Sequence, residues 1–349
     1  MTSIHVTETD EENLPRNLIQ GLDFIDWKSK VKPGSTVFIK PNLTWTEYTK
    51  GVTTSPAVIE HLLDILRDRA GRIIVGESDG GNHAFTADQA FKGHGLDKIC
   101  GSRGIELVNL SRLPAVTVEE RVLDKNVSVV LPRLLLEDVD CFISVPVLKV
   151  HAMTGVSLSI KNLWGCYSDP MRCLHHKFLD YKLALIAKKV RPQIIVIDGK
   201  YALDGHGPMF GSAVRMNLLI CSDNVVTADR VGANIMGMNP SYHPHAKLAG
   251  MRPAELTHIS IASRAGLGPL DLSNVRSNQD WKGFAKSFRV RKTMMDRLCI
   301  LTFNSEFIAE IVFESRLREP IFWLSDKLIR NETELDMAVS CRSEPRTYQ

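Results

Sequence analysis

Short apolar runs alternate with stretches of helical periodicity over the first two thirds of the chain. Continuous apolar runs are typical of strands buried on both faces of a parallel sheet, and apolar residues three or four positions apart are typical of helices. We predict helices at residues 55–69, 87–91 and 224–236. We predict strands at residues 34–40, 72–76, 105–109, 127–131, 140–146, 193–198, 216–221 and 258–262. This alternation predicts an α/β fold with a mostly parallel sheet and flanking helices.

The pattern changes near residue 265. Residues 267–280 are rich in Gly, Pro, Ser and Asn, which is typical of a linker. Residues 281–332 combine basic, aromatic and apolar residues at helical spacing. We therefore expect an α/β catalytic body over 1–265, possibly in two lobes, and a helical C-terminal appendage over 266–349. The appendage is expected to pack on the body, to mediate a homodimer or to lie on a membrane surface.

Composition argues against several classes of function. A formal net charge of +3 over 349 residues is too small to indicate a nucleic-acid partner. No apolar run is long enough to cross a bilayer, and the polar residues 1–13 do not have the pattern of a secretory signal. Seven scattered cysteines without a CxxC pair favour reduced thiols over disulfides. A cytoplasmic protein without a transmembrane segment is therefore expected.

Polar residues gather where two predicted strands end. Lys40 and Asn42 follow the strand at 34–40, and Lys149 and His151 follow the strand at 140–146. Ligands of open α/β sheets bind beyond the carboxyl ends of the strands. Lysine offers a point charge to phosphate or carboxylate, and histidine transfers protons near neutral pH. We predict an anion site in which Lys149 and His151 are catalytic and the ligand is bound by Lys40, Asn42, Lys161 and Asn162.

Five further residues complete the predicted site. Asp79 and Asp198 follow buried strands, and such carboxylates, together with substrate phosphates, are typical ligands of Mg²⁺. His176, the second of two adjacent histidines, is a third catalytic candidate. Ser55 precedes a proline at a helix start, and Gly207 lies in a glycine-rich segment that allows close approach to a ligand. Both are predicted to contact a cofactor.

Known phosphate and nucleophile motifs do not account for these residues. The chain has no GxxxxGK[ST] sequence and no glycine fingerprint of a dinucleotide fold after its first predicted strand. Residues 76–80 formally match the GxSxG nucleophile motif, but two more loop residues follow, whereas a nucleophile elbow turns directly into a helix. Any nucleotide binding is expected to be of an unconventional kind.

The order of the motifs resembles the domain-of-unknown-function family numbered 362. The resemblance covers roughly residues 34–240 and rests on the sequences VFIKPN, TTSP, VGESD, VLKVH, SIKNLWG, VIDG and GHGP. The family is similar to proteins often coupled to ferredoxin-type iron–sulfur modules, which implies redox work in some members. This chain lacks the ferredoxin cysteine runs, so no iron–sulfur cluster is expected. Its electrons would come from NAD(P)H or another external reduced donor.

Three functions follow from these observations. The first is an ATP-dependent reductase, with lysines on the phosphates, Asp79 or Asp198 on Mg²⁺ and a small-molecule substrate whose carbonyl or carboxylate oxygen is phosphorylated before hydride addition. The second is a hydroxy-acid isomerase or racemase, because the order of strand, histidine and glycine–lysine segment is also similar to the lactate racemase fold. The third is a non-catalytic binding or scaffold protein.

Overall fold

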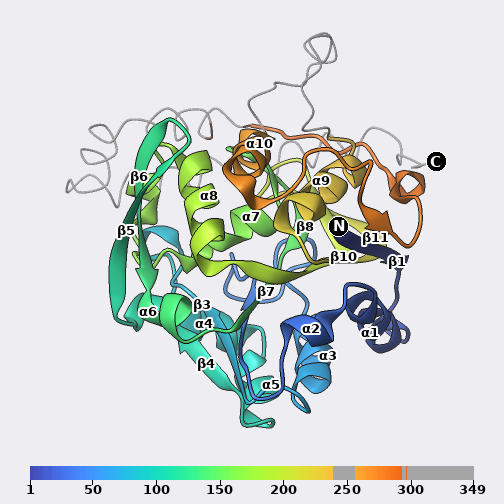
Figure 1. The fold of residues 1–349 in the computed structure, drawn as a ribbon, viewed down its shortest axis with the longest axis horizontal. Coiled ribbons are helices and arrows are strands. Elements are labelled where there is room, and N and C mark those ends of the chain that lie inside the picture. Colours follow the sequence, from blue (N-terminus) through green and yellow to red (C-terminus); the bar gives the residue numbers. More distant parts are fainter. Residues whose placement is uncertain (239–255, 293–295, 297–349) are drawn as a thin grey trace.

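A ten-stranded sheet organises the part of the chain that the structure describes, residues 1–238, 256–292 and 296 of a computed structural model (Figure 1). Its strands are β1 (Ser3–Glu8), β2 (Thr36–Pro41), β3 (Arg72–Glu77), β4 (Glu106–Asn109), β7 (Cys141–Val145), β8 (Val147–His151), β9 (Gly155–Ser157), β10 (Pro192–Asp204), β11 (Ser212–Ser222) and β12 (Arg276–Ser277). They run in the order β12-β1-β11-β10-β7-β2-β3-β4, and β8 and β9 branch from β10. A separate hairpin joins β5 (Ala115–Val122) to β6 (Lys125–Pro132).

The central strands are parallel, as the sequence predicted. β10, β7, β2, β3 and β4 pair in parallel, and β1 and β11 add an antiparallel edge. Parallel strands that are buried on both faces read as continuous apolar runs, which explains why these strands were recognisable. Their carboxyl ends lie along one edge of the sheet, where Lys40, Glu77 and Val145 are found.

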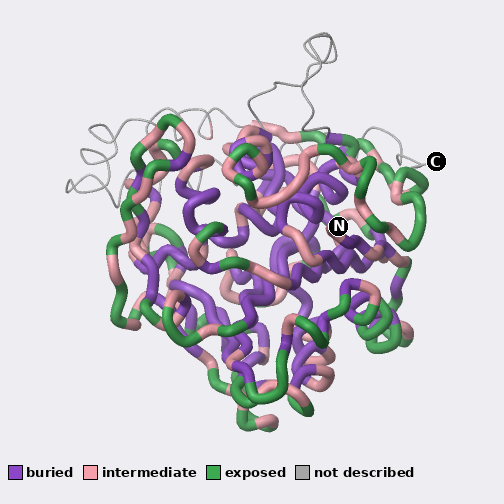
Figure 2. Tube along the Cα trace, in the orientation of Figure 1, coloured by how far each residue is buried: buried purple, intermediate pink, exposed green. Residues whose placement is uncertain are grey.

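Helices cover both faces of the sheet (Figures 1 and 2). One core contains residues of α1 (Leu14–Phe24), α3 (Pro56–Leu66), α4 (Ala87–Gly93) and α5 (Leu96–Gly101). The opposite core contains residues of α7 (Ser159–Asn162), α8 (Leu179–Val190), α9 (Val225–Ile235) and α10 (Thr257–Ala262). The remaining α-helices of the described residues are α2 (Trp27–Lys30) and α6 (Arg133–Glu137).

Alternation along each strand decides which core a side chain enters. In β2, Val37 and Ile39 lie in the α3 core, while Phe38 lies in the α8 core. Lys40 of β2 pairs with Ser144 of β7, and Lys40 comes two residues after Phe38 in the strand. Both therefore point to the α8 face. Asp198 follows Val196, which lies in the α3 core, so Asp198 points to the other face.

The prediction of a strand at 258–262 is wrong, because Thr257–Ala262 is the helix α10. His258, Ile259, Ile261 and Ala262 are all buried against surrounding elements. A short segment that is buried on every side reads as a continuous apolar run in either conformation, so its periodicity could not separate helix from strand. β1, α1, β5, β8 and α8 were not predicted, and the strand predicted at 127–131 is β6, which belongs to the separate hairpin and not to the large sheet.

The described residues beyond 265 lie on the main body. β12 pairs in parallel with β1, Val290 bridges to Gly205, and Phe288 is buried in the α8 core. The backbone nitrogen of Arg289 also donates to Asp204. Apart from residue 296, the helical appendage predicted for the end of the chain lies outside the described residues from 293 onward. Across the described part of the chain, no helix is both long and apolar enough to cross a membrane.

Gly76 of β3 provides a test of the packing between the strands. A Cβ atom at Gly76 would lie 2.5 Å from Cζ of Phe38 on β2, inside the α8 core. Gly76→Ala is expected to lower the free energy of unfolding by about 1–3 kcal/mol, measured by urea denaturation, because it overpacks a dense core. Gly81→Ala is the matched control, since nothing lies within 4 Å of a Cβ there. Equal stability of the two variants would contradict this account.

Candidate functional site

A buried ion pair joins the ends of β2 and β3. Nζ of Lys40 lies 2.5 Å from Oε2 of Glu77, and the two side chains are 1% and 7% exposed. Lys40 also donates to the carbonyl oxygen of Pro41 at 3.1 Å, and Glu77 accepts from the backbone of Ser78 at 3.0 Å. A Cβ atom at Gly165 would lie 2.7 Å from the Lys40 ammonium, so only glycine lets this segment close over the pair.

Lys149 is held by three uncharged acceptors. Its ammonium donates to Oδ1 of Asn42 at 3.1 Å, Oγ1 of Thr44 at 2.7 Å and the carbonyl oxygen of Val52 at 2.9 Å. These bonds use its three protons and fasten the loop of residues 42–55 onto β8. Burial and the charge of Lys161 hold the pKa of Lys149 well below its usual value. Lys149 therefore fixes the loop, and a ligand would have to displace one of these acceptors to reach it.

The two predicted asparagines connect strand ends. Asn42 accepts from Lys149 and donates its backbone N–H to Thr54 at 2.8 Å. Asn162 of α7 donates to Oγ of Ser144 at 3.2 Å and to the carbonyl oxygen of Lys40 at 3.3 Å. Each amide thus ties a loop or helix of the site to the carboxyl edge of the sheet.

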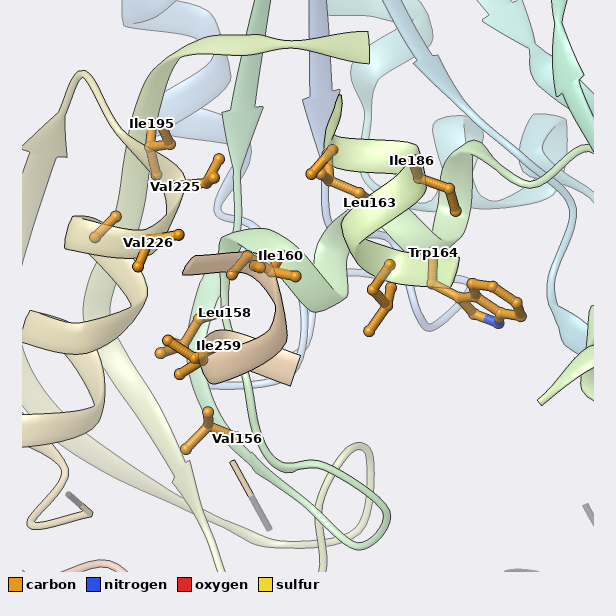
Figure 3. Close-up of a cluster of buried hydrophobic side chains, with 14 of the residues drawn as sticks. Val156, Leu158, Ile160, Leu163, Trp164, Ile186, Ile195, Val225, Val226 and Ile259 are labelled. Carbon is orange, nitrogen blue, oxygen red and sulfur yellow. The ribbon is translucent and has the colours of Figure 1, made fainter. Parts of the chain in front are cut away.

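A buried carboxylate positions α7. Asp229 of α9 accepts from the backbone nitrogens of Ser159 and Ile160 at 2.7 and 3.0 Å, and it also accepts from the Ser159 hydroxyl. These are free N–H groups of the first turn of α7, which a negative charge stabilises. Burial raises the pKa of Asp229 to about 7. Figure 3 shows Ile160 of α7 and Ile259 of α10 in one cluster of buried apolar side chains, through which α7 also packs on its neighbours.

Lys161, also on α7, is the cation of the site that is available to a ligand. It is partly buried, and within the described residues its ammonium donates no hydrogen bond and forms no ion pair. Burial, together with the positive charges of Arg172 and Lys40, lowers its pKa to about 7. A buried charge without a partner is costly, and an anion placed beside Lys161 would remove that cost.

Arg172 lies next to Lys161. It begins the short helix η4 (Arg172–His175), and its Nη1 is buried without a hydrogen-bond partner among the described residues. Burial lowers the pKa of Arg172, whereas Glu77 and Asp79 oppose that shift. The hydroxyl of Ser78, between these two carboxylates in the chain, is also buried and unpaired. Guanidinium, ammonium and hydroxyl donors of this kind suit a phosphate or carboxylate.

The charge of Lys161 acts on three buried imidazoles, those of His151, His176 and His258. Nδ1 of His151 accepts from the backbone nitrogen of Met153 at 3.1 Å, which leaves Nε2 to carry the proton of the neutral ring. Burial and Lys161 hold the pKa of His151 well below its usual value. The same two causes lower the pKa values of His176 and His258 to about 3. All three rings are therefore neutral near pH 7.

The structure separates Asp198 and Ser55 from this cluster, whereas Gly207 packs against Val150 and Ala152, on either side of His151. Asp198 accepts from the backbone nitrogens of Ser55 and Lys200 at 2.8 and 3.2 Å, on the α3 face of the sheet. A Cβ atom at Gly207 would lie 1.8 Å from the carbonyl oxygen of Val150, so this glycine is required by close backbone packing. Of the predicted cofactor contacts, Ser55 and Gly207 therefore have local structural roles.

The two predicted metal ligands do not share a site. β10 and β3 are separated by β7 and β2, which places Asp198 and Asp79 about 14 Å apart at the usual spacing of strands. Asp79 accepts from the backbone nitrogen of Ala87 at 2.8 Å and from Asn109 at 2.7 Å. It lies near Arg172, whose pKa it raises. No group of three or more metal-binding side chains occurs in the described ranges.

Sequence reasoning missed four residues of the cluster: Glu77, Arg172, Asp229 and His258. Glu77 ends β3, and only the neighbouring Asp79 was chosen from this acidic segment as a candidate. Asp229 lay inside the helix predicted at 224–236, but its carboxylate caps α7. His258 lay inside a predicted strand, and Arg172 lay in a segment without periodicity. No signal in the sequence links these positions to Lys161.

The chain belongs to the family described as a domain of unknown function numbered 362, whose model matches residues 37–234. A thylakoid-associated protein of Synechocystis sp. is 28% identical to it over 241 residues, which are 65% of this chain and 72% of that protein. A Thermotoga maritima protein of known crystal structure is 13% identical, with a TM-score of 0.36 over 57% of this chain. The matched region covers 53% of the Thermotoga maritima protein, about half of its length.

His258 provides a test of how far buried, unpaired polar groups at the site lower the stability of the protein. Its ring is 0% exposed, and neither nitrogen has a hydrogen-bond partner in the described part of the chain. His258→Leu is expected to raise the free energy of unfolding by about 1 kcal/mol in urea denaturation, because it removes two unpaired polar atoms at similar volume. His94→Leu is the control and should destabilise, since His94 contacts the carbonyl oxygen of Ala90 at 2.7 Å. A destabilised His258→Leu protein would refute the argument.

Proposed function

We propose that this protein is a small-molecule enzyme that binds an anionic, phosphate-bearing ligand between Lys161 and Arg172. The observation that carries the proposal is that, among the described residues, the Lys161 ammonium has no hydrogen bond or ion pair and Nη1 of the neighbouring Arg172 is buried without a partner. Polar groups buried during folding are normally hydrogen-bonded, and exceptions gather at functional sites. A bound phosphate would accept from both residues and would offset their mutual repulsion.

In its specific form, the proposal is an ATP-dependent reductase acting on a carbonyl-conjugated metabolite. Transfer of the γ-phosphoryl group of ATP to a carbonyl or carboxylate oxygen would release ADP and make the adjacent carbon easier to reduce. The carbon would accept a hydride from NAD(P)H, or electrons from another external reduced donor, and the phosphoryl group would leave as inorganic phosphate. Asp79 is the better placed of the two proposed Mg²⁺ ligands, because its charge acts on Arg172, whereas Asp198 points to the α3 face of the sheet. Lys40, Lys149 and Asn162 would keep the strand ends and α7 in position.

Neutral imidazoles supply the proposed acid–base chemistry. His151 presents Nε2–H beside Lys161, with Nδ1 fixed by the backbone of Met153. A neutral ring in this orientation donates a proton or a hydrogen bond to an oxyanion as charge develops. His176 contacts the carbonyl oxygen of Cys173 at 2.7 Å and would act from the η4 side. A cytoplasmic location, the absence of a nucleic-acid partner and a possible homodimer belong to the same proposal.

A hydroxy-acid isomerase or racemase is the second candidate. It is favoured by the placement of two neutral imidazoles, His151 and His176, beside one ammonium, because such an enzyme removes and returns a proton next to a bound carboxylate. Exchange of the α-hydrogen of a hydroxy acid in D₂O, followed by NMR, would distinguish it from the reductase. The reductase would exchange no such hydrogen. Binding without either activity would leave the scaffold role.

Anion binding is expected to depend on Lys161. Mg-ATP and, separately, tripolyphosphate should raise the melting temperature of the protein, because both bind the native state. Lys161→Ala should remove the rise, whereas the matched control Lys98→Ala, at an exposed position on α5, should retain it. Lys149→Ala is less suitable, since it would leave three buried acceptors without their donor. Unchanged binding in Lys161→Ala would overturn the proposed function.

The pH dependence of anion binding follows from the lowered pKa of Lys161, about 7. The charged form is the form that binds, and it is lost as the pH rises through that value. The affinity for sulfate, whose own charge is constant here, should therefore fall by up to roughly tenfold per pH unit above pH 7 in calorimetric titrations. Lys161→Arg should flatten this profile, because arginine stays charged. A flat profile for the wild-type protein would exclude Lys161 as the titrating group.

A further inference from the structure

A cavity lies on the α3 side of the sheet, and Lys161 does not line it. Its volume is about 320 Å³, within the range of small-molecule sites. Its walls come from three parts of the chain: the turn and helix that follow β1, the loop of residues 42–55 with the start of α3, and the strands β10 and β11. None of the residues proposed to contact the anion lines it.

Most of the inner wall of the cavity is apolar. Leu14 of α1, Val58 of α3 and Leu219 of β11 are 7%, 3% and 1% exposed and line it together with Ala57. An apolar wall of this extent gives little to a hydrated inorganic ion and favours a ligand with a hydrocarbon body. The cavity therefore suits an organic molecule.

Asp198 supplies a negative charge to this apolar wall. It is 5% exposed, and no ammonium or guanidinium group of the described residues forms an ion pair with it. The backbone nitrogens of Ser55 and Lys200 occupy one position on each carboxylate oxygen, which leaves further acceptor positions open. Burial raises the pKa of Asp198, the effect expected for a carboxylate without a counter-ion.

Tyr48 and the residues at the rim of the cavity also favour a positively charged ligand. Burial and the charge of Asp198 raise the pKa of Tyr48 to about 12, so its hydroxyl stays neutral and remains a hydrogen-bonding group. At the rim, Glu11 pairs with Lys200, and Asp10 adds another carboxylate. The lining carries three carboxylates against one ammonium, which would repel a nucleotide or a carboxylic acid.

We propose that this cavity is a binding site for a small organic cation, a protonated amine attached to an apolar body. The ammonium would lie at Asp198 with Tyr48 beside it, and the apolar body would pack against Leu14, Val58 and Leu219. The start of α3 adds to the selectivity, because Asp198 already accepts the Ser55 N–H at that helix end, where an anionic ligand would otherwise bind.

The test uses three probes of one shape: phenethylamine, 2-phenylethanol and phenylacetate, titrated into the full-length protein by calorimetry at pH 7. Phenethylamine should bind, the neutral alcohol should bind roughly tenfold or more weakly, and the carboxylate should not bind. Equal binding of the amine and the alcohol would refute a role for the charge of Asp198. A titration with MgCl₂ should give no heat, and a Mg²⁺ signal that displaces the amine would also refute the proposal.

Two variants locate the site. Asp198→Asn should weaken amine binding roughly tenfold or more, since the amide keeps the size of the side chain but loses its charge. If that variant folds poorly, Ala57→Phe is the decisive one, because it fills the cavity and leaves each hydrogen bond of Asp198 in place. Lys161→Ala should bind the amine normally, so failure of the anion site and failure of this one remain distinguishable. Amine binding that survives Ala57→Phe would place it elsewhere and overturn the inference.

Discussion

The burial of more positive than negative charge at one edge of the sheet is the constraint on which this structure depends. An ammonium group inside a protein costs several kcal/mol unless partners compensate for its lost hydration. Lys40 is compensated by Glu77, and Lys149 is compensated by three uncharged oxygens. Among the described residues, Lys161 has neither kind of partner, and its pKa is lowered accordingly. Gly165, Asn162 and the buried Asp229 hold the backbone in the one arrangement that brings these charges together.

The sheet divides the chemistry of the protein between its two faces. Alternation along β2 and β7 sends Lys40 and Ser144 to the side of α7, and alternation along β10 sends Asp198 to the side of α3. One face thus collects cations and neutral imidazoles, and the other holds an isolated carboxylate in an apolar cavity. Two groups that both follow buried strands can therefore belong to different sites.

Much of the fold could be predicted because parallel strands buried on both faces leave an unmistakable apolar run. β2, which holds Lys40, and β7 were found in this way, and α3 and α9 were found from apolar residues at helical spacing, whereas β8, which holds Lys149, was not predicted. α10 was predicted as a strand because full burial removes the periodicity that distinguishes a helix. The dense polar segment of residues 149–162 indicated the neighbourhood of the site. The role of each residue in this segment depends on hydrogen bonds between segments that are distant in the sequence, such as Lys149 with Val52 and Ser159 with Asp229. No local sequence pattern encodes such bonds.

The loop of residues 42–55 belongs to both faces at once. Asn42, Thr44 and Val52 hold the ammonium of Lys149, while Tyr48 and Ser55 line the cavity around Asp198. A molecule that restrains this loop at one end changes the entropy that remains to be lost at the other. A ligand in the cavity that orders Tyr48 and Ser55 would therefore also restrain the three oxygens that hold Lys149. The loop is thus a mechanical link between the two faces of the sheet.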